Sequence, residues 1–182
     1  MYGIEAWGSC SDEQFSSIFK LQKRAVRSIK GISTRTSCKP TFSELKIMTL
    51  PTIYVFKILI YAKKEYYKGD FVLHNDIHSY ETRGRNNISN LPRRTEMLNR
   101  SPRYSAIRMF NQLPIQFRQL SSNLLKSILL FHFKNNPFYT IEEAVLSITA
   151  LRLENFRCVA KNNGQSPLHS YKVFNVIDNN LN

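Results

Sequence analysis

The residues best suited to chemistry in this sequence are basic side chains that recur at helical spacing near the N-terminus. At about 100° per residue, the basic residues between positions 20 and 30 fall in one arc of a helix. This basic arc consists of Lys20, Lys23, Arg24, Arg27 and Lys30. A helical row of cations follows a phosphate backbone without reading bases. An ordinary solvated helix face is the alternative interpretation.

A second basic cluster contains only arginine and lies where helical periodicity is absent. Its members are Arg83, Arg85, Arg93, Arg94, Arg100 and Arg103. The guanidinium fork suits bidentate contacts with phosphate. Tyr80 and Tyr104 offer rings on which unpaired bases can stack. Ordinary loop chemistry accounts for the cluster equally well.

Patterns for metal binding and catalysis are weak. His74 and His78 have the spacing of one helical face, but no closely spaced cysteines accompany them, so we expect neither a metal nor another cofactor. Cys38 and His132 are residue types that serve as nucleophile and base, yet nothing near either one in the sequence orients it. We therefore expect no catalytic residue.

The charge balance favours a polyanionic partner. The 182 residues include 26 Lys plus Arg and 13 Asp plus Glu, for a net charge of +13. Nucleic acid is the leading candidate, and an anionic membrane surface is second. Further candidates to extend the basic arc are Lys39, Lys46, Lys63 and Lys64. Binding through so many cations predicts a strong dependence on salt.

Cysteine usage and the absence of a long apolar run favour an intracellular protein, nuclear or cytoplasmic. Cys10, Cys38 and Cys158 are odd in number and widely spaced, which is typical of free thiols in a reducing compartment. The most apolar run, residues 53–62, is interrupted by Lys57 and is about half of a membrane span. No membrane partner is expected.

The cap signals predict a helix over residues 12–30, between Ser11 and Gly31. Its apolar arc should face a core and consists of Phe15, Ile18, Phe19, Gln22, Ala25, Val26 and Ile29. Thr41 with Glu44 predicts a capping box that starts a short helix ending near Met48.

Later segments alternate between helix and irregular chain. Pro51 and Gly69 bracket a helix that is apolar all round and should be central. Residues 70–101 read as loop, with a short strand at 71–73. Helices are then expected from 102 to about 111 and from 123 to 133, and Thr140 with Glu143 forms another capping box.

Several short motifs, in order, carry a family resemblance. They are Tyr2-Gly3-Ile4 with Trp7-Gly8, Leu21-Gln22-Lys23-Arg24-Ala25-Val26-Arg27, Phe42 with Glu44-Leu45-Lys46-Ile47 and Leu50-Pro51, Thr82-Arg83, Ser101-Pro102 and Tyr104 with Asn111-Gln112-Leu113-Pro114, and Phe138-Tyr139-Thr140-Ile141-Glu142-Glu143. In this order they resemble the region downstream of the palm in reverse transcriptases of non-LTR, jockey-like retrotransposons. The resemblance covers residues 2–145 and none of 146–182.

The resemblance implies a helical thumb-like bundle, in agreement with the mainly α fold that the periodicity predicts. The composition adds a long irregular basic loop and a weakly ordered C-terminal tail. The corresponding segments are a thumb-like part at 1–69, the basic loop at 70–101, a helical part at 102–145 and the tail at 146–182. In the family this region helps to hold the template and primer. The palm of these polymerases binds two metals through adjacent aspartates, whereas no two aspartates are adjacent here, so we expect no polymerase activity from this polypeptide alone.

Three functions follow as hypotheses. The first is a truncated reverse transcriptase fragment that binds RNA or DNA by backbone contacts without sequence specificity. The second is a structural or interaction module that self-associates through an uncovered apolar N-terminus at Tyr2, Ile4 and Trp7. The third is a decayed retroelement remnant with no selected function.

Overall fold

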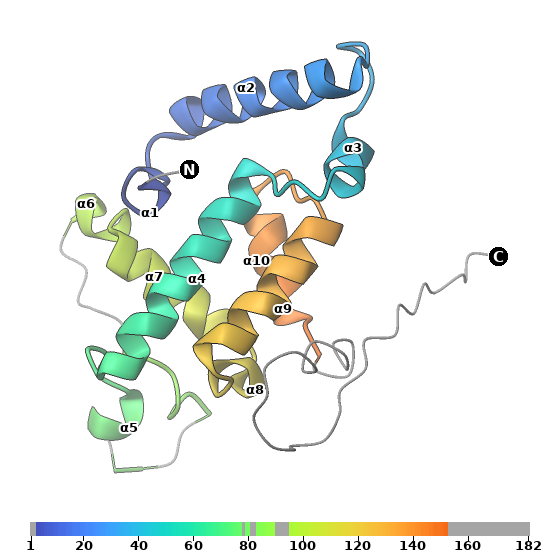
Figure 1. Ribbon diagram of the computed structural model, residues 1–182. Helices are drawn as coiled ribbons and strands as arrows, with labels where there is room; N and C mark the ends of the chain where they lie inside the picture. The colour runs from blue at the N-terminus through green and yellow to red at the C-terminus, as the bar shows by residue number, and fades with distance from the viewer. Residues whose placement is uncertain (1–2, 78, 81–82, 90–94, 153–182) are drawn as a thin grey trace.

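The chain folds as a mainly helical bundle, as predicted (Figure 1). The computed structural model describes residues 3–77, 79–80, 83–89 and 95–152. Their helices are α1 (Ile4–Trp7), α2 (Asp12–Lys30), α3 (Lys39–Glu44), α4 (Leu50–Lys68), α5 (His74–Ile77), α6 (Glu96–Asn99), α7 (Pro102–Gln112), α8 (Ile115–Arg118), α9 (Ser122–Asn135) and α10 (Ile141–Thr149). In place of the strand predicted at 71–73, the described chain has one antiparallel bridge, between Leu73 and Ile88.

The α4 helix lies at the centre of the bundle. It has Pro51 in its first turn and ends at Gly69, whose φ of 76° is left-handed. Val55, Ile58 and Leu59 are fully buried. Helices α1, α7, α9 and α10 pack around it, and Figure 1 shows α4 running through the middle of the molecule. Helices from residues 1–69 and 102–149 therefore share one core.

The α2 helix has the predicted bounds and lies across the N-terminal end of α4 (Figure 1). The Ser11 side chain accepts from the Gln14 N–H at 3.4 Å, and Gly31 ends the helix with a φ of 65°. The Gln22 amide joins the two helices, because it donates to the Met48 carbonyl at 2.9 Å and accepts from the Leu50 N–H at 2.8 Å. Gln22 thereby caps α4 from α2.

The short helix predicted to begin at Thr41 begins earlier, so the proposed capping box is wrong. Helix α3 starts at Lys39, has a proline in its first turn and contains Thr41 as a buried residue. It ends before Lys46, whose φ of 53° is left-handed. The Lys46 ammonium donates to Asn135 Oδ1 at 2.6 Å, which ties the end of α3 to α9.

The prediction of an uncovered apolar N-terminus is wrong for Ile4 and Trp7, and Tyr2 lies outside the described residues. Ile4 is fully buried, because α1 packs on α4. Trp7 is half-buried, with its ring centroid 6.5 Å from that of Phe15. Gly8 permits this packing, since a Cβ there would collide with the Tyr54 ring.

We expect Gln22→Ala to lower the free energy of unfolding by about 1–2 kcal/mol, because the Leu50 N–H and the Met48 carbonyl lose their partner in a partly buried place. Urea unfolding measures the change. Gln14→Ala is the control, since its exposed side chain lies on the same helix, and it should cost less than about 0.5 kcal/mol. Equal effects of the two variants would contradict the assigned role of Gln22.

Candidate nucleic-acid interface

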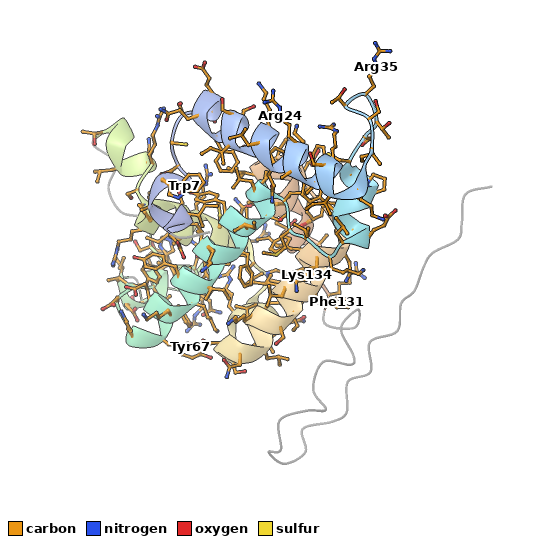
Figure 2. The ribbon with its side chains drawn as sticks, turned by 45° about the horizontal axis from the view of Figure 1, so that its top comes forward. Trp7, Arg24, Arg35, Tyr67, Phe131 and Lys134 are labelled. Atoms are coloured by element: carbon orange, nitrogen blue, oxygen red, sulfur yellow. The ribbon has the colours of Figure 1, made fainter. Side chains whose placement is uncertain are left out.

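The basic arc predicted on α2 divides into exposed and internally bound cations. The side chains of Lys20 and Arg24 are exposed and form no hydrogen bond or ion pair with any described residue. Figure 2 shows Arg24 pointing away from the bundle. Both side chains are therefore available to an external anion.

The other three cations of the arc have partners in the chain. The Lys23 ammonium lies 4.7 Å from the centroid of the Phe19 ring. Arg27 donates to the Thr36 carbonyl from Nε at 3.4 Å and from Nη2 at 3.3 Å. Lys30 pairs with Glu44 at 2.8 Å, and because both side chains are substantially exposed the pair contributes little to stability. Of the five, Lys30 is thus the one whose charge is neutralised.

Two basic residues beyond the arc extend the charged surface. Arg35 is exposed on the turn after α2, and Figure 2 shows it pointing away from the body of the protein. Lys39 is exposed at the start of α3. We call the combined surface the α2–α3 cationic face; its members are Lys20, Lys23, Arg24, Arg27, Arg35 and Lys39. Arg35 was not predicted as a candidate, because its turn carries no periodic signal.

The apolar arc of α2 is narrower than predicted. Phe19 and Val26 are buried as expected, but Ala25 is exposed and Ile29 is 67% exposed, so their assignment to the core is wrong. Leu21, which lies near them in the helical projection, is 60% exposed. Helix α2 packs on α3 and α4 with the side that carries Phe19 and Val26, which leaves the Ile29 side uncovered.

The second basic cluster lies on a loop that is held against the core. Arg83 is exposed and Arg85 is half-buried, whereas Arg93 and Arg94 lie outside the described residues. The Asn111 side chain accepts from the Ile88 N–H and donates to the Ile88 carbonyl, each at 2.9 Å. The loop is therefore anchored to the end of α7. The sequence predicted only that a helix ends near Asn111, and no local pattern indicates so distant a partner for its amide.

Arg118, for which no sequence pattern predicted a role, completes the anchor. Its guanidinium donates to the Leu113 and Asn111 carbonyls, each at 2.6 Å, and to Asn87 Oδ1 at 2.9 Å. The buried Lys63 donates to the Arg118 carbonyl, and its ammonium lies 4.5 Å from the Tyr67 ring centroid. Burial lowers the pKa of Lys63. Lys63 is therefore part of the core and cannot extend the basic arc.

Two further members of the expected loop site serve the fold instead. Arg103 donates to the Asp70 carbonyl at 2.6 Å and lies 5.0 Å from the centroid of the Phe71 ring. Tyr104 is 6% exposed, so the idea that it stacks on bases is wrong. It lies on the inward side of α7, which packs against α4. Tyr80, by contrast, is 64% exposed.

The two basic regions do not form one patch. The α2–α3 cationic face lies at the N-terminal end of α4, and the loop with Arg83 and Arg85 follows its C-terminal end (Figure 1). A helix of the length of α4 spans about 28 Å at 1.5 Å per residue. The α2–α3 cationic face is therefore the stronger candidate, since it gathers more cations in one place.

Cys38 and His132, the candidate nucleophile and base, contact different partners. Cys38 is buried and its Sγ lies 3.3 Å from the Tyr139 hydroxyl, while His132 Nε2 lies 3.0 Å from Ser147 Oγ. Within the described part of the chain, no three residues that bind metals come together. His74 begins the short helix α5, and His78 lies outside the described residues.

A hollow of about 420 Å³ lies between the start of α2, α7 and the start of α10. Arg100 and Arg108 line it together with Asp12 and Glu142. Because these charges balance, the hollow does not favour a polyanion as the α2–α3 cationic face does.

No protein-family model, curated protein or solved structure matches this chain. In the part of the chain that the structure describes, no helix is both long enough and apolar enough to cross a bilayer.

Burial lowers the pKa of His132 from 6.5 to about 4. The unfolded chain therefore binds a proton first as the pH falls below 6.5. We expect this histidine to leave stability unchanged above pH 6.5 and to cost about 3 kcal/mol as the pH falls to 4. Urea unfolding at several pH values measures the loss, and His132→Gln should remove it, whereas the control His74→Gln should not. Equal acid sensitivity of wild type and His132→Gln would refute this assignment.

Proposed function

We propose that this chain binds the sugar-phosphate backbone of RNA or DNA without sequence specificity, as a helical segment related to the region downstream of the palm in non-LTR retrotransposon reverse transcriptases. The observation that carries the proposal is the α2–α3 cationic face, where the side chains of Lys20, Arg24 and Arg35 are exposed and have no partner among the described residues. The proposal includes no catalytic step.

The spacing of the cations supports a contact with a strand. Lys20 and Arg24 lie one helical turn apart, about 6 Å between their Cβ atoms. Each nucleotide step of one strand rises only about 3.4 Å along the helix axis. Lys20 and Arg24 are therefore far enough apart to contact different phosphates of one strand, and the side chains reach them without entering a groove.

The buried side of α2 favours nucleic acid over a lipid surface. A helix that lies in a membrane interface inserts a broad apolar face. In α2 the large residues Phe19 and Val26 are instead packed in the bundle, which leaves Leu21 and Ile29 as its exposed large aliphatic side chains. Two aliphatic side chains provide little apolar area for insertion into a membrane. Positive charge is therefore the main property of the α2–α3 cationic face.

The test is a triple variant, Lys20→Gln with Arg24→Gln and Arg35→Gln. We expect the affinity for a labelled 20-nucleotide single strand of random sequence to fall at least tenfold at low salt. The slope of log affinity against log salt should decrease by about 2, since each lost phosphate contact on a single strand removes about 0.7. Fluorescence anisotropy at several salt concentrations measures both quantities, and circular dichroism should show an unchanged helix content.

The matched control removes the same charge from other helices, through Lys64→Gln, Lys126→Gln and Lys134→Gln, which are all exposed. It should lower affinity much less than the triple variant on α2 and the turn after it. Equal losses would indicate a diffuse charge effect and refute the proposed face. Failure of the wild type to bind any oligonucleotide, with binding to vesicles of phosphatidylserine and phosphatidylcholine, would replace nucleic acid by a membrane surface.

A further inference from the structure

Tyr139 occupies the point where α2, α3 and the turn before α10 meet. Its ring makes edge contacts with Phe19 of α2 and Phe42 of α3, at centroid distances of 5.2 and 6.3 Å. Its hydroxyl lies 3.3 Å from the buried Cys38 thiol. The ring is therefore fixed from three directions while its residue remains half-exposed.

Cations from two helices converge on this ring. The Lys23 ammonium of α2 lies 5.5 Å from the ring centroid, and the Lys39 ammonium of α3 lies 5.7 Å from it. Arg27 lies one helical turn after Lys23 on α2, and its guanidinium is held by the Thr36 carbonyl. Residues 16 positions apart in the sequence thus bring their charges to one aromatic side chain.

These charges have no counter-charge of their own. Among the described residues, neither lysine nor Arg27 forms an ion pair. The Glu143 carboxylate accepts from the Tyr139 N–H at 3.0 Å and is used as part of the α10 cap. Cation–π attraction offsets part of the repulsion between the two ammonium groups. An anion that contacts both would offset it more completely.

We propose that Lys23, Arg27 and Lys39, oriented around Tyr139, form a phosphate site that holds one phosphodiester group of the bound strand. The inference rests on the proposed function, which supplies the bound strand. It adds one site at which a phosphate of that strand has a fixed position on the protein. Lys20, Arg24 and Arg35 lack such support, so they attract the strand, whereas the Tyr139 site sets its position on the protein. Tyr139 acts as a positioning residue, because its ring orients the two lysines.

The first test keeps the charge constant. Tyr139→Leu removes the ring but no cation, and we expect it to weaken binding of the 20-nucleotide single strand roughly threefold at low salt. Tyr139→Phe keeps the ring and should restore most of the lost affinity. The control is Tyr67→Leu, which removes a ring that is 57% exposed at the far end of α4 and should change affinity little.

The second test removes one cation. Lys39→Gln should weaken binding roughly two- to fivefold and lower the salt slope by about 0.7, whereas Lys126→Gln should do neither. Lys39 is exposed, so this variant decides the matter if Tyr139→Leu does not fold. Inorganic phosphate, compared with chloride at equal ionic strength, should also raise the melting temperature of the wild type more than that of Lys39→Gln.

The outcomes separate the two proposals. If the wild type binds the oligonucleotide but Lys39→Gln and a folded Tyr139→Leu behave as their controls do, the phosphate site is overturned and backbone binding stands. If the wild type binds no oligonucleotide, the proposed function is refuted, and the phosphate site around Tyr139 is refuted as well. Selective loss in both variants, with rescue by Tyr139→Phe, supports the site.

Discussion

The arrangement of this protein depends on the all-round apolar surface of α4. A helix that exposes large aliphatic and aromatic side chains in every direction is stable in water only when other helices cover each side. Burying each such side chain contributes about 1.5–3 kcal/mol. Helices α1, α7, α9 and α10 supply most of that cover. Segments before and after α4 in the sequence must therefore both pack against α4.

This constraint also places the charged surface. The N-terminal end of α4 is joined to α2 through the Gln22 amide, and to the turn before α10 through the Thr49 hydroxyl, which donates to the Phe138 carbonyl. Phe138 directly precedes Tyr139 in the chain, and Gln22 lies one helical turn after Phe19, whose ring contacts Tyr139. The contacts that cap the central helix therefore also hold α2 and the turn before α10 in place. The positions of the cations on the α2–α3 cationic face depend on these core contacts.

Local signals predicted much of the fold, and non-local packing accounts for what they missed. Ser11, Gly31 and Gly69 act within one helical turn, so the bounds of α2 and the end of α4 were predicted correctly. The exposure of Ile29 depends on which neighbours lie beside α2, and no periodicity encodes that. Lys20 and Arg24 were predicted as candidates from spacing alone. The convergence of Lys23 and Lys39 on Tyr139 joins residues far apart in the sequence, so no local pattern could reveal it.

The most direct test of the central claim, that the α2–α3 cationic face contacts the strand, is lysine footprinting of the intact chain. Acetylation by a succinimidyl ester, read by mass spectrometry, is compared with and without the 20-nucleotide single strand. The account predicts protection of Lys20, Lys23 and Lys39, with unchanged reactivity of the exposed Lys64 and Lys126. Equal protection of all five lysines, or protection confined to Lys64 and Lys126, would contradict it.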